Sequence, residues 1–301
     1  MAEDAPIPYI ARTRDYYAAL GYPAPYRWAE HGDVPFQRLE KPLAGNRVAL
    51  ITTAALQRPG QGDQRPGAPY NGAAKFFRVY SAGTAADPAL GINHVAIDFK
   101  HTTAEDPGGY FPLAALRRAA SSGRIGSVSP RFHGVPTHRS QRMTLEEYAP
   151  EVLTRCRADH ADAAILVPNC PVCHQSLALI ARHLEANGIP TVILGCARDI
   201  VERAGVPRFL FSDFPLGNAA GRPNDPASQD LTLGLALDLL EQATAPRTTV
   251  RSPLRWRDDA DWKRDYGSVE GLSAAAIAGL RADFEAQKAA GKNIQSAGFQ
   301  A

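Results

Sequence analysis

Apolar runs alternate with segments of helical periodicity through most of the chain. The apolar runs predict β-strands at residues 47–53, 93–98, 125–128, 163–167, 191–194 and 208–211. Apolar positions at helical spacing predict helices near residues 12–20, 113–121, 144–158, 174–187, 197–203, 229–241 and 273–288. Apolar strands separated by helices are typical of a mostly parallel sheet that is covered on both faces. The pattern therefore predicts an α/β fold with an open sheet and helices on both of its faces.

Regularity is lower toward both ends, which divides the chain into three parts. Residues 1–45 are expected to form an N-terminal arm, residues 46–245 an α/β catalytic core, and residues 246–301 a C-terminal extension. The core could consist of two similar α/β halves with a boundary near residues 140–160. The Gly- and Pro-rich loop at residues 58–72 has no apolar period, and we expect it to close over the functional site.

The composition is that of a soluble enzyme. A net charge of +2 over 301 residues leaves no concentrated basic surface for nucleic acid. The acidic N-terminus lacks the pattern of a signal peptide, and no apolar run is long enough to span a bilayer. Four cysteines in a chain of this length do not indicate a disulfide scaffold. We therefore expect a cytoplasmic location, with neither nucleic acid nor a membrane as a partner.

The most informative chemical feature is the pair of cysteines Cys170 and Cys173. The pair follows the predicted strand 163–167 and precedes the helical pattern of residues 174–187, so it lies at a helix N-terminus. Free N–H groups and the helix dipole stabilise a thiolate there. One thiol can attack a substrate, and the other can release the adduct by forming a disulfide. The same spacing also suits half of a zinc site or two buried structural cysteines.

Other reactive side chains follow the predicted strands. Ligands bind beyond the carboxyl ends of the strands in an open parallel sheet. The substrate-binding candidates at that edge are Thr53, His133, Cys196, Asp213 and Asn218, with His138 in the same loop as His133. His101, which lies in a polar segment, is the candidate proton donor. The N–H groups near Cys173 suit a substrate that carries a carboxylate.

Two alternatives use Cys196 as a third cysteine. In the first, zinc is bound by Cys170, Cys173 and Cys196, completed by one of His101, His133 or His174. In the second, Cys170 and Cys196 face each other across a substrate, as in a cofactor-independent racemase.

Several other functions lack their usual motifs in this sequence. The chain has no Gly-x-Gly-x-x-Gly sequence and no P-loop, so no nucleotide cofactor is expected. It also lacks the Gly-x-Ser-x-Gly elbow of serine hydrolases. His94 and Cys156 fall inside a predicted strand and a predicted helix, and both are interpreted as core residues. Thr144 and Glu147 match a capping box that would begin the helix of residues 144–158.

A resemblance to a known family is strongest over residues 163–230 and lies in the stretches Val167–Gln175, Ala181–Glu185, Gly188–Thr191, Ala197–Ile200 and Phe211–Asn218. In these stretches the chain resembles the glycine/sarcosine/betaine reductase selenoprotein B family, to which the selenocysteine subunit of D-proline reductase is related. The family implies reductive cleavage of a bond at the α-carbon of an amino acid or betaine. It also implies reducing equivalents from a thioredoxin-like partner.

The resemblance places Cys170 where the family has selenocysteine, Cys173 at the second position of the U-x-x-C-x-x-C pattern, and Ser176 at the third. The missing selenocysteine and third cysteine are departures from that pattern. We therefore predict a stand-alone cysteine-dependent reductase that cleaves a C–S or C–N bond of a small amino-acid-like or betaine-like substrate. Cys170 would be the nucleophile and Cys173 the resolving thiol, without a bound cofactor. A thioredoxin-like protein or a low-molecular-weight thiol would reduce it, and a homo-oligomer is compatible with the sequence.

Overall fold

The computed structural model describes residues 5–22, 24–65, 72–92, 94, 96–137 and 139–296. Its main sheet has eight strands in the order β10-β9-β8-β7-β1-β6-β3, with β5 pairing the beginning of β1. The strands are β1 (Arg47–Thr52), β3 (Tyr80–Gly83), β5 (Ser127–Val128), β6 (Arg131–Gly134), β7 (Ala163–Val167), β8 (Thr191–Gly195), β9 (Arg208–Phe211) and β10 (Thr248–Arg251). All pairs are parallel except the pair of β3 with β6. The predicted mostly parallel α/β sheet is confirmed.

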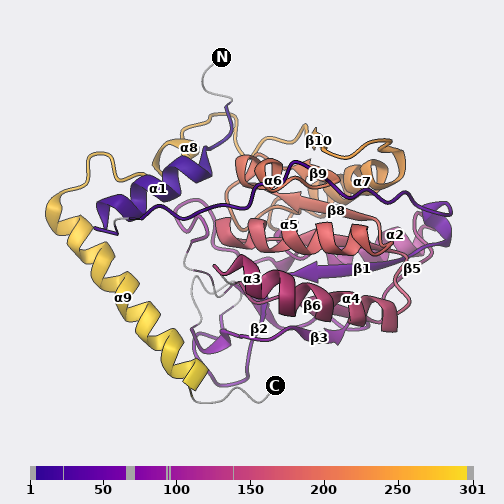
Figure 1. Ribbon diagram of the computed structural model, residues 1–301, viewed down its shortest axis with the longest axis horizontal. Helices are drawn as coiled ribbons and strands as arrows, with labels where there is room; N and C mark the ends of the chain where they lie inside the picture. Colours follow the sequence, from indigo (N-terminus) through magenta and orange to yellow (C-terminus); the bar gives the residue numbers. More distant parts are fainter. Residues whose placement is uncertain are drawn as a thin grey trace.

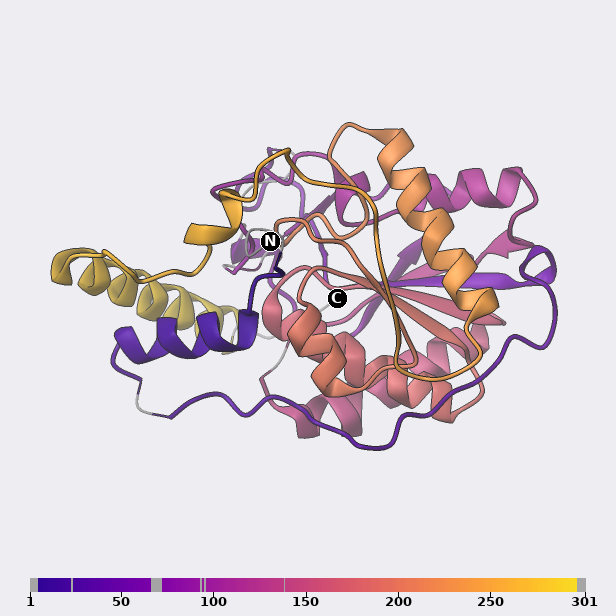
Figure 2. The ribbon, with the colours of Figure 1, turned by 90° about the horizontal axis from the view of Figure 1, so that it is seen from above.

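Helices cover both faces of this sheet (Figure 2). One face carries α2 (Leu113–Ser121) and α7 (Pro226–Gln242), and the other carries α4 (Ala149–Ala158), α5 (Pro171–Ala186) and α6 (Arg198–Ala204). Strand β7 shows why both layers form. Successive side chains of a strand point to opposite faces of the sheet. The consecutive residues Ile165 and Leu166 accordingly pack into the two opposite hydrophobic cores, and both are fully buried.

Strand β1 marks the point at which the winding of the sheet reverses. The strands that follow it in the core, β6 and β7, lie on its two sides. The chain reaches β6 through α2 on one face and leaves β7 through α5 on the other. Connections that diverge in this way leave a crevice beyond the carboxyl ends of the two strands. The ends of β1 and β7 therefore lie at the switch point of the sheet.

The two ends of the chain pack together beside the sheet. Helix α1 (Tyr9–Ala19) contacts α6, where the backbone N–H of Ile10 donates to Asp199 at 2.8 Å. Arg12 donates to backbone carbonyls in and after α8 (Trp262–Asp265). The arm then runs along the α5 face, and α9 (Ala274–Ser296) stands apart from the sheet (Figures 1 and 2). Within the described residues, no helix is both long and apolar enough to cross a membrane.

Three local predictions differ from the structure. The strand predicted at 93–98 is wrong, because the described residues of this segment form a loop after the short strand β4 (Leu90–Gly91), which pairs with β2 (Ala55–Leu56). Here the N–H of Asp98 bonds to the carbonyl of Leu216 rather than to a neighbouring strand. The predicted capping box is also wrong. The helical segment begins at Gln141, where the Ser140 side chain accepts from the N–H of Met143.

The third difference concerns strands that the sequence did not predict: β3, β6 and β10 in the main sheet, and the short strands β2 and β4. Strand β10 follows residue 246, where the C-terminal extension was expected, yet it pairs with β9 at the edge of the sheet. Part of the loop expected to close over the site, residues 66–71, lies outside the described residues.

Candidate functional site

The cysteine pair forms the first turn of α5, beyond the end of β7. Cys170 is the N-cap residue in an extended backbone conformation, and its Sγ accepts the N–H of Cys173 at 3.2 Å. Pro171 occupies the first helical position, where a missing N–H costs nothing. The two sulfurs are joined as a disulfide with the Cα atoms 4.9 Å apart. The helix thus begins three residues earlier than predicted and directs its first donors at Cys170.

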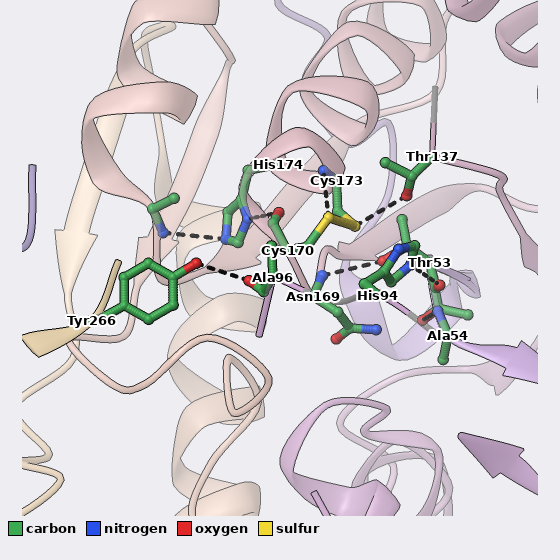
Figure 3. Close-up of a disulfide and its surroundings, with 12 residues drawn as sticks. Thr53, Ala54, His94, Ala96, Thr137, Asn169, Cys170, Cys173, His174 and Tyr266 are labelled. Carbon is green, nitrogen blue, oxygen red and sulfur yellow. Dashed lines mark hydrogen bonds between the residues drawn. A yellow bond between two sulfur atoms is a disulfide. The ribbon is translucent and has the colours of Figure 1, made fainter. Parts of the chain in front are cut away.

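The two cysteines differ in their surroundings. Cys170 is 4% exposed and Cys173 is fully buried. The hydroxyl of Thr137, which follows β6, lies 3.1 Å from the Sγ of Cys173 (Figure 3). Cys170 is therefore slightly more exposed than Cys173, whose Sγ contacts a hydroxyl.

His94 lies against the pair, although the sequence interpretation placed it in the core. A nitrogen of its half-buried ring and the two sulfurs all lie within 4.8 Å of one another. Its Nε2 is 2.9 Å from the carbonyl oxygen of Thr53. Because a carbonyl only accepts, Nε2 carries the proton and Nδ1 keeps its lone pair in the neutral ring. Burial, assisted by Lys75, lowers the pKa of His94 to about 4, so the ring is neutral near pH 7.

Thr53 and Asn169 lie beside His94, below the cysteine pair in the view of Figure 3. The N–H of Asn169 donates to the hydroxyl of Thr53 at 3.1 Å, which joins the end of β7 to the end of β1. The side-chain amide of Asn169 is fully buried, and among the described residues neither its nitrogen nor its oxygen has a hydrogen-bond partner. Such a group is costly unless a ligand or water completes it.

His174 connects the cysteine turn to the next strand. Its Nδ1 donates to the carbonyl of Cys170 at 2.7 Å, and its Nε2 accepts the N–H of Cys196 at 2.9 Å. Burial lowers the pKa of this fully buried ring to about 4. A Cβ atom on Gly195 would lie 2.8 Å from the ring, so glycine is needed for this close packing. Both ring nitrogens of His174 are thus used to hold the backbone of the site.

His101 and His133 lie in separate clusters. The Nδ1 of His101 is 2.9 Å from the carboxylate of Asp98, and its Nε2 is 3.5 Å from that of Asp265. His133 is fully buried beneath α4, with Nδ1 2.9 Å from the hydroxyl of Ser81. Burial lowers the pKa of His133 to about 4. Neither ring belongs to the group formed by His94 and the two sulfurs. His138 lies outside the described residues.

The remaining candidates lie beyond β8 and β9. Cys196 is buried with its Sγ 3.8 Å from the carbonyl of Pro215, and burial raises the pKa of its thiol. Asp213 pairs with Arg251 and Lys263. Asn218 accepts from the hydroxyl of Thr102 at 3.2 Å. Of the predicted substrate-binding residues, Thr53 contacts His94 and Asn169, and Cys196 is joined to the pair through its backbone N–H, which His174 accepts.

Sequence reasoning missed His94, Thr137 and Asn169 as neighbours of the cysteines. Asn169 directly precedes Cys170, so its position alone could have drawn attention to it. His94 and Thr137 reach the site through long-range packing, for which the sequence carries no local signal. Ser176, at the third position of the family pattern, is fully buried, and its hydroxyl has no hydrogen-bond partner among the described residues.

A cavity of about 820 Å³ lies between α1, the arm and α9. Among the described residues, its lining includes five aromatic and four cationic residues and no acidic one: Tyr17, Tyr22, Tyr26, Trp28, Phe284, Arg14, Arg27, Arg139 and Lys288. One wall is fastened to α5, because Gln175 donates to the hydroxyl of Tyr26 and accepts the N–H of Ala29 at 2.7 Å. The cavity therefore borders the helix that begins with the cysteine pair.

The chain is similar to proteins that are named as reductase subunits. D-proline reductase subunit gamma of Acetoanaerobium sticklandii is 30% identical over 191 residues, which cover 63% of this chain and 76% of that protein. The glycine reductase complex component B subunit gamma of Carboxydothermus hydrogenoformans is 23% identical over 221 residues, 72% of this chain and 48% of that protein. The same subunit of Peptoclostridium acidaminophilum is 27% identical over 119 residues, 38% of this chain and 27% of that protein.

The chain thus spans about half, or less, of the glycine reductase subunits that it matches. No family model matches it, and no solved structure does. The identity to the D-proline reductase subunit, together with its coverage, confirms the family suggested by the sequence. This chain belongs to the glycine/sarcosine/betaine reductase selenoprotein B family, together with the gamma subunit of D-proline reductase.

Proposed function

We propose that this chain is a cysteine-dependent reductase that cleaves a C–S or C–N bond of a small amino-acid-like or betaine-like substrate. The observation that carries the proposal is the Cys170–Cys173 disulfide at the crevice beyond β1 and β7. A dithiol that becomes a disulfide supplies the two electrons that reductive cleavage of one bond requires. The curated relatives are named as reductase subunits, which supports the same class of reaction.

Cys170 is the nucleophile in this proposal. It is the more exposed sulfur of the pair, and it accepts the N–H of Cys173 at the positive end of α5. A hydrogen bond and the helix dipole both stabilise the thiolate over the thiol. Cys173, buried and in contact with Thr137, is the resolving thiol.

The electrons and atoms balance for either bond. For a C–N bond, the Cys170 sulfur displaces nitrogen from the substrate carbon, and the nitrogen leaves with a proton. The Cys173 sulfur then attacks the Cys170 sulfur, and the released carbon takes a proton. For a C–S bond, Cys170 attacks the substrate sulfur, the carbon takes a proton, and Cys173 expels the sulfur as sulfide. Both routes end in the disulfide, which a thioredoxin-like protein or a low-molecular-weight thiol reduces.

His94 carries the proton in this scheme, in place of His101. Its neutral ring lies beside the sulfurs and offers the Nδ1 lone pair, whereas His101 is bonded to Asp98. A neutral imidazole can take the thiol proton from Cys170 and return it to the leaving group. The unpartnered amide of Asn169 is proposed to bind a polar group of the substrate.

A single-turnover experiment tests the proposal. Fully reduced chain, freed of external thiol, is mixed with D-proline, glycine or a panel of thiones, and remaining thiols are alkylated before intact-mass measurement. We expect one Cys170–Cys173 disulfide for each molecule of product. Product that forms while both thiols remain free would show that the cysteines do not supply the electrons.

We predict that His94→Gln lowers kcat by about 10²-fold, in the range that general acid–base catalysis contributes. In the wild type, kcat/KM should fall as the pH drops toward about 4, because the ring becomes protonated and cannot accept the thiol proton. The pH–rate profile of His94→Gln should lack this acid limb. His160→Asn, an exposed histidine in a loop, is the matched control and should keep the wild-type profile. If the acid limb of the pH–rate profile is unchanged in His94→Gln, a titratable group other than His94 causes it.

The cationic aromatic cavity is the proposed site of substrate recognition. Arg27 lines it and is exposed, so its charge can meet a substrate carboxylate. We predict that Arg27→Gln raises KM about tenfold with little change in kcat, as expected for binding shared by ground state and transition state. Arg257→Gln, exposed and outside the cavity lining, should leave KM unchanged. Equal KM values for Arg27→Gln and Arg257→Gln would show that Arg27 does not bind the substrate carboxylate.

A further inference from the structure

We propose that His94 and the two thiols of the reduced cysteine pair form a zinc site. The pair is then either oxidised to the disulfide or reduced and bound to zinc. The ligand atoms of His94, Cys170 and Cys173 all lie within 4.8 Å of one another. Two thiolates and one imidazole are the donors that Zn²⁺ prefers. This set differs from the zinc set expected from the sequence, because His94 takes the place of Cys196.

Each of the three ligands already has a partner of the kind that orients metal ligands. The Nε2–H of His94 donates to the carbonyl of Thr53, which leaves Nδ1 as the nitrogen able to bind a metal. The Sγ of Cys170 accepts the N–H of Cys173, and the Sγ of Cys173 contacts the hydroxyl of Thr137. Such second contacts fix ring orientation and stabilise thiolates in metal sites.

The geometry separates this set from the other candidates. Cys196 does not belong to the group, and His174 uses both of its ring nitrogens on the backbone. Three protein ligands leave a fourth position of the tetrahedron open, which is the arrangement of catalytic rather than structural zinc sites. Of the three ligands, His94 is half-buried and both cysteines are buried.

Metal binding and oxidation exclude each other. Disulfide-bonded sulfurs are about 2 Å apart and carry no thiolate charge. Around a tetrahedral zinc with Zn–S bonds of about 2.3 Å, two sulfurs must separate to roughly 3.8 Å. Only the reduced pair can therefore bind the ion, and bound zinc would protect the thiols from oxidation. The inference does not depend on the reductase proposal, since it concerns the same thiols in a different state.

The test is a Zn²⁺ titration of the reduced, metal-free full-length chain in competition with a chromophoric chelator. We expect one zinc per chain in the wild type and in Cys196→Ser. We expect loss of binding in Cys170→Ser and Cys173→Ser, and affinity at least tenfold weaker in His94→Ala. Circular dichroism of each variant checks that the fold is retained. Wild-type affinity in His94→Ala, or loss of the zinc in Cys196→Ser, would overturn the assignment.

A second measurement keeps the two proposals apart. Oxidation of the zinc-loaded chain with diamide should release one zinc for each Cys170–Cys173 disulfide formed, as followed by metal release and intact mass. Disulfide formation without zinc release would overturn the metal site and leave the reductase proposal standing. Stoichiometric zinc release in a chain that no substrate oxidises would support the metal site and count against the reductase.

Discussion

Cys170→Ser is expected to lower turnover by at least about 10³-fold while the chain remains folded. A serine hydroxyl is not ionised near neutral pH and cannot form the disulfide that supplies the electrons. The fold should persist because Cys170 is the N-cap residue of α5, and serine is among the preferred residues at that position. Turnover with a dithiol donor and the melting temperature, measured on the same preparation, check both parts.

Cys156→Ala is the matched control for this variant. Cys156 is fully buried in α4, and burial raises the pKa of its thiol to about 12, so it is an inert thiol. We expect unchanged turnover and a stability loss of about 1 kcal/mol from the small cavity.

Cys173→Ser should behave differently again, because Cys170 could attack but the adduct could not be resolved. Intact mass should then show trapped substrate, and wild-type turnover in Cys170→Ser would exclude the thiol mechanism.

The central strands and the start of α5 could be predicted from the sequence because their signals are local. Strand β7 was predicted with the bounds that it has, since five consecutive buried apolar residues lie between polar turns. The following helix was found through its apolar period, although Pro171 and Cys170 extend it toward the strand. Burial on both faces leaves such segments little choice of structure.

The segment around His94 could not be predicted in the same way. Val95 and Ile97 alternate with polar neighbours, which imitates a strand. The described part of the segment is instead fixed by distant groups, such as the hydroxyl of Tyr266, which donates to the carbonyl of Ala96 at 2.8 Å. His94 reaches Thr53 through this loop. A neighbour of the cysteines that depends on such packing leaves no pattern in the sequence.

The sequence placed the candidates beyond the strand ends at one edge of the sheet, and that edge is wide. Neighbouring strands are about 4.8 Å apart, so residues after β9 lie two strand spacings from β7. Thr53 reaches the cysteine pair because β1 is the direct neighbour of β7. Between the turns of Cys170 and Cys196 lies the ring of His174, bonded to both backbones. The parallel sheet therefore predicts the edge at which a site lies better than it predicts which residues form the site.

Arg208→Met is expected to destabilise the fold by about 3–5 kcal/mol, the largest effect on stability that we predict. Arg208 and Glu185 form an ion pair with an N–O distance of 2.9 Å, and both side chains are fully buried. Arg208 also donates to the carbonyl of Gln37, and Glu185 accepts from the N–H of the same residue. The pair thus fastens the arm to α5 and β9. Removing the cation leaves a buried carboxylate without its counter-charge, and urea unfolding at pH 8 measures the loss.

The loss in Arg208→Met should shrink as the pH falls. Burial raises the pKa of Glu185 to about 7 even though Arg208 lowers it, so without Arg208 the folded-state pKa rises further above the ordinary value of 4.5. The folded variant then binds a proton that the unfolded chain does not, and its stability decreases as the pH rises through that range. We expect a smaller deficit at pH 5.5 than at pH 8. Glu185→Leu combined with Arg208→Met should be more stable at pH 8 than Arg208→Met alone, because no charge is left buried. The opposite result would be a double variant that is less stable than Arg208→Met, with a deficit that does not depend on pH. Arg208 would then act through packing rather than through charge, against the ring of Phe36, whose centroid lies 4.3 Å from the guanidinium carbon.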